Sequence, residues 1–150
     1  MNLSFQEKSI LGSLVITISL FSYYFLAIFD VLTGATSAAQ LPIVLFGVVI
    51  AMIVVEVIYH IFIALQDRRA DEDERDRLIQ AKATRIAYFV LVTGCMTLVG
   101  HSMFMAVYSG AENQLAMQSP LVLSSLIVCS FIVAEIVGFS MQLYYYRRGF

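Results

Sequence analysis

Residues 41–66 read LPIVLFGVVIAMIVVEVIYHIFIALQ, and this stretch decides the fold. Its only charged side chain is Glu56. A helix needs about 20 consecutive apolar residues to cross the hydrocarbon core of a bilayer. The stretch therefore predicts a transmembrane helix, with Pro42 in the first turn, where a proline costs no backbone hydrogen bond.

Three more apolar segments of similar length occupy residues 10–33, 86–108 and 120–146. The composition agrees with this pattern, because 60% of the 150 residues are hydrophobic and 13% are charged. A soluble domain carries about 25% charged residues. The sequence thus predicts a single all-α domain over residues 1–150, folded as a four-helix transmembrane bundle. No basic patch is large enough to indicate a nucleic-acid partner.

The Lys and Arg residues lie only between and beyond the apolar spans. Six of the nine fall within residues 67–85, and the others are Lys8, Arg147 and Arg148. The connections at 34–40 and 109–119 contain neither Lys nor Arg. Because basic residues are retained on the cytoplasmic side, we expect a multi-pass protein with N-in and C-in topology and a cytoplasmic middle segment.

The polar segment 67–85 also predicts the start of the third helix. Asp71 and Glu74 have the spacing of a capping box, which marks a helix N-terminus. An apolar stripe of helical period then runs from Leu78 to Ile86. The third helix is therefore expected to run from about residue 71 to residue 108, extending into the cytoplasm before it enters the bilayer.

Residues 73–79 read DERDRLI, and residues 82–88 read KATRIAY. These residues resemble a motif of small bacterial membrane proteins of unknown function, in which a cytoplasmic DERD helix leads directly into a membrane span. The resemblance covers only this short part of the chain. It implies a location in the bacterial inner membrane and a four-span layout, and it assigns no site residues.

Four ionisable side chains lie inside the predicted spans: Glu56, His60, His101 and Glu135. Each costs several kcal/mol in hydrocarbon unless it is paired or hydrated. Counting about 1.5 Å per residue from the span midpoints places Glu56 about 4 Å and Glu135 about 5 Å inward of the bilayer midplane. We therefore expect both carboxylates to point into the bundle. Two neighbouring carboxylates in such a medium do not both ionise unless a cation lies between them.

His60 lies one helical turn from Glu56 on the same face. Together with Glu135, these residues form a candidate polar path that leads toward the cytoplasmic side. His101 and Thr97 share a helix face that leads toward the opposite side. This pattern supports a small proton or cation transporter or channel. Two alternatives remain open: structural pairing between helices, and a transition-metal site formed by Glu56, His60 and Glu135. The sequence implies no cofactor.

The charged start of the third helix suggests a different function. Its acidic and basic side chains offer a docking face for a cytoplasmic or membrane protein; the candidate residues are Asp71, Asp73, Glu74, Arg75, Asp76 and Arg77. The chain has no phosphate-binding loop, no nucleophile motif and no cysteine pair with zinc spacing, so an enzyme is not expected. Our leading prediction is a non-enzymatic membrane partner or anchor, with transport as the alternative.

Small residues recur on two of the spans. Ser130, Ala134 and Gly138 repeat every four positions on the fourth helix, and Gly47 and Ala51 do so on the second. Such stripes allow helices to approach closely. They are compatible both with internal packing and with a homodimer.

Overall fold

The computed structural model describes residues 5–66, 73–108 and 120–148. These residues form four long helices: α1 (Phe5–Leu32), α2 (Leu41–Gln66), α3 (Glu74–Tyr108) and α4 (Pro120–Arg148). A short 3-10 helix, η1 (Ala38–Gln40), precedes α2. All four long helices are long and apolar enough to cross a membrane. The predicted all-α fold with four membrane-crossing helices is confirmed.

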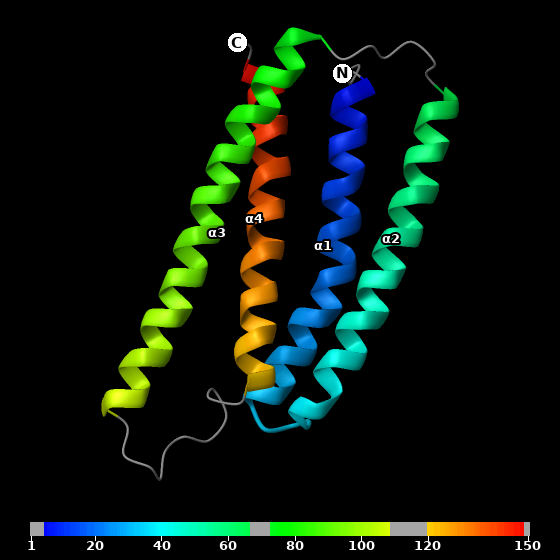
Figure 1. The fold of residues 1–150 in the computed structure, drawn as a ribbon. Coiled ribbons are helices and arrows are strands. Elements are labelled where there is room, and N and C mark those ends of the chain that lie inside the picture. Colours follow the sequence, from blue (N-terminus) through cyan, green and yellow to red (C-terminus); the bar gives the residue numbers. More distant parts are fainter. Residues whose placement is uncertain (1–4, 67–72, 109–119, 149–150) are drawn as a thin grey trace.

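Successive helices run in opposite directions (Figure 1). The start of α1, the end of α2, the start of α3 and the end of α4 therefore lie at one end of the molecule, and the α1–α2 connection lies at the other end. We call the end that holds the start of α1 and the end of α4 the basic end, because Lys8, Arg75 and Arg147 lie there. The charge pattern predicts that the basic end faces the cytoplasm.

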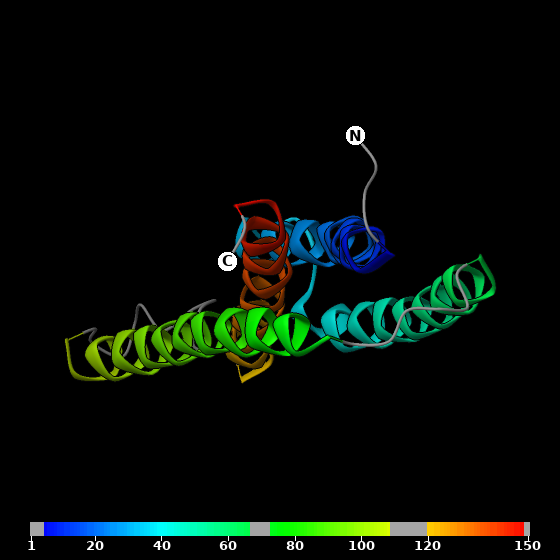
Figure 2. The ribbon, with the colours of Figure 1, turned by 90° about the horizontal axis from the view of Figure 1, so that it is seen from above.

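The helices are arranged in the spatial order α3, α4, α1, α2 (Figure 1). α3 packs along α4, α4 packs along α1, and α1 packs along α2. Seen from above, α2 and α3 extend to opposite sides of the central α1–α4 pair (Figure 2). Within the described ranges α2 and α3 form no packed interface. The bundle is therefore open on the side between these two helices.

α1 ends at Leu32 and is terminated by Gly34. Gly34 has a φ of +78°, a conformation that residues with a Cβ rarely adopt. The Gly34 N–H donates to the Val31 carbonyl at 3.1 Å, and the Ala35 N–H donates to the Asp30 carbonyl at 2.8 Å. These two bonds form a Schellman motif, which satisfies carbonyls at the helix C-terminus.

α3 begins at Glu74, later than the predicted start at about residue 71. Asp73 caps it: its Oδ1 accepts from the Glu74 N–H at 2.7 Å, and its own N–H donates to Asp76 Oδ2 at 3.3 Å. The reciprocal pair is thus Asp73 with Asp76, whereas Asp71 lies outside the described residues. Because the acidic run has carboxylates at several successive positions, more than one pair has the spacing of a capping box. The spacing alone therefore did not show which residue caps the helix.

Small residues bring α3 and α4 close together. A Cβ added to Gly94 would lie 3.0 Å from Ser130 Oγ, and a Cβ added to Gly138 would lie 3.3 Å from the Ala87 Cβ. Ala134, between these positions on α4, is buried. The predicted stripe on the fourth helix is therefore used in internal packing.

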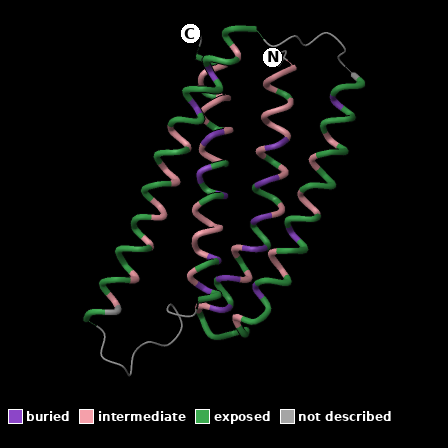
Figure 3. Tube along the Cα trace, in the orientation of Figure 1, coloured by how far each residue is buried: buried purple, intermediate pink, exposed green. Residues whose placement is uncertain are grey.

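The largest buried cluster lies toward the end opposite the basic end. α1 contributes half of it, and α2 and α4 contribute two residues each; its members are Phe21, Tyr24, Ile28, Val31, Leu41, Val48, Val122 and Ile132. Figure 3 shows buried positions along α1 and very few on α3. Among the described side chains of α3, only Ile79 and Ala83 are buried.

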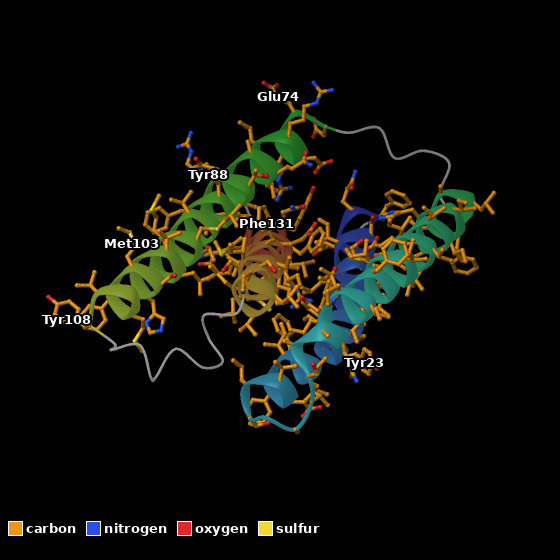
Figure 4. The ribbon with its side chains drawn as sticks, turned by 60° about the horizontal axis from the view of Figure 1, so that its bottom comes forward. Tyr23, Glu74, Tyr88, Met103, Tyr108 and Phe131 are labelled. Atoms are coloured by element: carbon orange, nitrogen blue, oxygen red, sulfur yellow. The ribbon has the colours of Figure 1, made fainter. Side chains whose placement is uncertain are left out.

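Most of the surface of α3 is apolar and exposed. Tyr88, Met103 and Tyr108 project from it, as Phe131 does from α4 and Tyr23 from α1 (Figure 4). Such surface is unfavourable in water, and lipid tails are as apolar as these side chains. The distribution agrees with a molecule whose main solvent is the bilayer.

Candidate functional site

Glu56 and His60 meet where α1 packs against α2. Glu56 Oε2 lies 3.1 Å from His60 Nε2. The Glu56 side chain is 18% exposed and the His60 side chain 52% exposed, so the carboxylate is the more enclosed of the two groups. The pairing expected from their separation of four residues is therefore present.

Ser13 of α1 completes this group. Its hydroxyl donates to Glu56 Oε2 at 3.0 Å, and its Oγ lies 3.3 Å from His60 Nε2. The Ser13 side chain is buried. Two polar side chains, one from each of two membrane-crossing helices, thus converge on one oxygen of the Glu56 carboxylate. We call Ser13, Glu56 and His60 the polar cluster.

A close contact next to the polar cluster sets the distance between α1 and α2. A Cβ on Gly12 would overlap the ring of Tyr59, so the ring lies where another residue would have its side chain. The Tyr59 hydroxyl donates to the Lys8 carbonyl at 2.6 Å. Because Gly12 and Tyr59 directly precede Ser13 and His60 in the chain, this contact holds the two polar residues in register.

Glu135 does not join the polar cluster. It lies on α4 and lines a groove of about 340 Å³ between α3 and α4, together with Tyr88, Phe131 and Gln142. Glu135 is exposed in this groove, so it is less enclosed than expected for a carboxylate that points into the bundle. The physical reason is the open arrangement, in which α2 and α3 leave this face of α4 uncovered.

Glu135 nevertheless lies within electrostatic range of the polar cluster. Glu56 lies near enough to Glu135 for its charge to act on it. In the described part of the chain, no three His, Cys, Asp or Glu side chains gather closely enough to hold a metal ion. The geometry therefore presents one compact cluster with a second carboxylate within electrostatic range.

His101 lies apart from the other predicted site residues. It is exposed on α3, which packs against α4 and not against α2. Thr97, on the same stripe, donates its hydroxyl to the Thr93 carbonyl of its own helix at 2.8 Å. The structure does not connect this outward stripe with the polar cluster.

The polar stripe of α1 was not among the predicted site residues. Ser13, Thr17 and Tyr24 are buried and recur at separations of four and seven residues, which places them on one helix face. The signal was present in the sequence, because three hydroxyl side chains share this spacing, but Ser19, Ser22 and Tyr23 add further hydroxyls to the same span. Hydroxyls are also common in packed membrane helices, which is why the spacing alone did not single them out.

Two acidic residues at the start of α3 form hydrogen bonds within the molecule. Asp73 and Asp76 cap the helix, and Asp76 Oδ1 also accepts a hydrogen bond from the Tyr146 hydroxyl of α4 at 2.7 Å. Glu74 and Arg75 are exposed, and Glu74 lies at the tip of the helix (Figure 4). Arg77 is exposed as well, although it is engaged in an interaction of its own.

Comparison with protein-family models, curated proteins and solved structures yields no match for this chain. Its function is therefore inferred from the chemistry of the polar cluster and from the position of that cluster within membrane-crossing helices.

Proposed function

We propose that this protein is a small multi-pass transporter or channel for protons or small cations, and that the polar cluster is its binding site. One observation carries the proposal: Ser13 Oγ and His60 Nε2 both lie within hydrogen-bond distance of Glu56 Oε2, inside helices that cross the membrane. Ionisable groups at such depth are costly, and they commonly mark ion pathways or proton relays.

The chemistry of the three groups suits a proton or a small cation. Histidine is the side chain that exchanges protons near neutral pH. His60 is half exposed and lies one turn closer to the basic end than Glu56, so it can take up a proton and pass it to the carboxylate over 3.1 Å. Ser13 holds the receiving oxygen in place. Glu135, which lines the neighbouring groove between α3 and α4, offers a second carboxyl group as a ligand for a cation.

Flux measurements in proteoliposomes test this proposal. Proton and cation flux is measured at several pH values for the unaltered protein, for Glu56→Gln, and for the Glu56→Gln/Glu135→Gln pair. We expect Glu56→Gln to reduce the flux at least about tenfold, because the amide cannot carry the proton or the charge.

Two histidine variants provide a matched control. His60→Gln should reduce the flux strongly, and His101→Gln should leave it unchanged, because His101 is exposed on α3 and apart from the polar cluster. The proposal fails if no gradient drives flux through well-folded protein. It also fails if Glu56→Gln conducts as well as the unaltered protein.

A second candidate function is that of a membrane partner or anchor, supported by the exposed charges at the start of α3. Glu74 and Arg75 are exposed there, and Leu78 is 53% exposed beside them. The Asp76–Tyr146 hydrogen bond holds this part of α3 against α4, so the charged face is presented rigidly. Resemblance of residues 73–88 to the DERD motif supports a bacterial inner-membrane location for either function.

Charge reversal separates the two candidates. Glu74→Lys with Arg75→Glu changes the exposed face without touching the cap formed by Asp73 and Asp76. If the face binds a protein, this double variant loses its cross-links to that protein in membranes and keeps any proton flux. If the polar cluster carries the function, the same variant behaves like the unaltered protein in both measurements.

A further inference from the structure

Glu135 is a carboxylate without a basic residue in its groove. The described residues that line the groove between α3 and α4 include no Lys, Arg or His. Glu56 differs in this respect, because Ser13 and His60 both contact its carboxylate. An ionisable group in a membrane-crossing helix is costly unless it is paired or hydrated, and it commonly marks a binding site. The other residues of the groove indicate which partner would fit Glu135.

Aromatic rings flank Glu135 along the groove. Phe131 lies four residues before it and Phe139 four residues after it on α4, so the three side chains share one helix face. Each ring is therefore about one turn, or 5–6 Å along the axis, from the carboxylate. Tyr88 lines the groove from α3 (Figure 4). Because ring faces attract positive charge over about 6 Å, this arrangement suits a cation at Glu135.

Small residues at the base of the groove leave room for a ligand of moderate size. A Cβ on Gly138 would lie 3.3 Å from the Ala87 Cβ, and Ala134 is buried beside them. The groove has a volume of about 340 Å³, which is typical of sites for small organic molecules. Its mostly apolar lining does not suit Mg²⁺ or Ca²⁺, which take about six or more oxygen ligands.

We propose that the groove between α3 and α4 binds an organic cation with apolar substituents, such as a quaternary ammonium compound. The Glu135 carboxylate neutralises the positive charge, and the rings of Tyr88, Phe131 and Phe139 contact the apolar groups. Glu135 is exposed, so the ligand reaches it directly from the bilayer. The site is separate from the polar cluster, and binding there does not require the proposed transport activity.

A second groove shows why the occupant is a cation and not a lipid tail. The groove between α1 and α2 has a volume of about 460 Å³, and the described residues that line it include Tyr23 and Ala51 but no charged side chain. A lipid tail or an apolar helix would gain at least as much contact area there. Only the groove at Glu135 combines a carboxylate with several rings among the described residues.

Binding of benzyltrimethylammonium tests the proposal. Equilibrium dialysis with the radiolabelled cation is carried out on the protein in an uncharged detergent. Unlabelled benzyltrimethylammonium and neopentylbenzene, which has the same shape without the charge, serve as competitors. We expect saturable binding that the cation displaces and that neopentylbenzene displaces far less well.

Two carboxylate variants locate the site. Glu135→Gln keeps the size of the side chain and removes its charge, so we expect affinity to fall at least about tenfold. Asp30→Asn is the matched control, because Asp30 lines a different groove, between α1 and the start of α2. It should bind the cation as the unaltered protein does.

Two neighbouring rings on α3 test the aromatic wall. Tyr88→Leu keeps an apolar side chain and removes a ring from the groove, so we expect affinity to fall about threefold. Phe89→Leu is the control, because Phe89 is 72% exposed and does not line the groove. It should leave the affinity unchanged.

Three results would overturn the proposal. Equal binding by Glu135→Gln would exclude the carboxylate, and equal displacement by neopentylbenzene would indicate a groove for lipid tails. A dimer in light scattering that excludes the cation would place a second copy in the groove. If Glu135→Gln does not fold, the competition on the unaltered protein still decides. Saturable binding in a protein without ion flux would refute the proposed function and leave this inference intact, whereas flux without binding would do the reverse.

Discussion

At the scale of the residue, Gly12 and Ser13 are chain neighbours with different roles: Gly12 allows close helix packing, and Ser13 belongs to the polar cluster. Gly12 admits the Tyr59 ring against the backbone of α1, and the next side chain, Ser13, then reaches Glu56. A residue with any side chain at position 12 would push α2 outward. The polar cluster therefore depends on a residue that has no polar group of its own.

Gly12→Ala tests this dependence. The added methyl group overlaps the Tyr59 ring, so we expect a loss of about 1–3 kcal/mol in the free energy of unfolding, as in other overpacked sites. Gly47→Ala is the control, because a Cβ there meets nothing within 4 Å. It should be neutral or slightly stabilising, since alanine is the better helix former by up to about 1 kcal/mol. Equal effects of the two substitutions on unfolding in detergent would contradict the proposed contact.

At the scale of the element, the pairing of α3 with α4 rests on small side chains and on one hydrogen bond. Gly94 faces Ser130, Ala87 faces Gly138, and at the basic end the Tyr146 hydroxyl binds Asp76. Without a hydrophobic effect between helices in lipid, close van der Waals packing supplies much of the attraction. α3 depends heavily on this interface, because its other faces are exposed.

Gly94→Ala should weaken the α3–α4 interface. A Cβ at this position lies 3.0 Å from Ser130 Oγ, so we expect destabilisation of about 1 kcal/mol. Ser130→Gly removes the obstructing side chain, and a double-mutant cycle should therefore show favourable coupling between the two changes. Gly100→Ala on the same helix meets open space and serves as the control. Additive effects at positions 94 and 130 would rule out the contact.

At the scale of the whole molecule, the open arrangement determines which polar groups share a site. α2 and α3 lie on opposite sides of the α1–α4 pair, so His60 and His101 are carried by helices that do not pack together. Glu135 faces the groove between α3 and α4, within the electrostatic range of Glu56. The arrangement therefore selects Ser13, and not His101, as the partner of the Glu56–His60 pair.

The predicted topology is tested by the labelling of single cysteines. In a background with Cys95→Ser and Cys129→Ser, Thr36→Cys places a thiol at the α1–α2 connection, and Arg75→Cys places one at the basic end. With N-in and C-in topology, a membrane-impermeant maleimide labels position 75 only from the cytoplasmic side and position 36 only from the opposite side. Reversed labelling would show that the basic residues face outward.

The sequence alone supported a large part of the fold. The apolar spans and the proline in the first turn of α2 were apparent from composition and local chemistry. Such features depend on bilayer thickness and on backbone geometry within a few residues, so they need no knowledge of neighbouring helices. The pairing of Glu56 with His60 was predictable for the same reason, because the two residues lie one turn apart on the same face of one helix.

Only the tertiary structure decided which helices are neighbours, and with that the membership of the site. Ser13 joined Glu56 and His60, Glu135 turned out to be exposed, and His101 lay apart on α3. Helical period indicates which residues of one helix share a face, but lipid-facing and helix-facing surfaces are equally apolar, so the period does not reveal what that face meets. The close approach of Tyr59 to Gly12 is a contact between two helices, and it becomes visible only when both are placed in space.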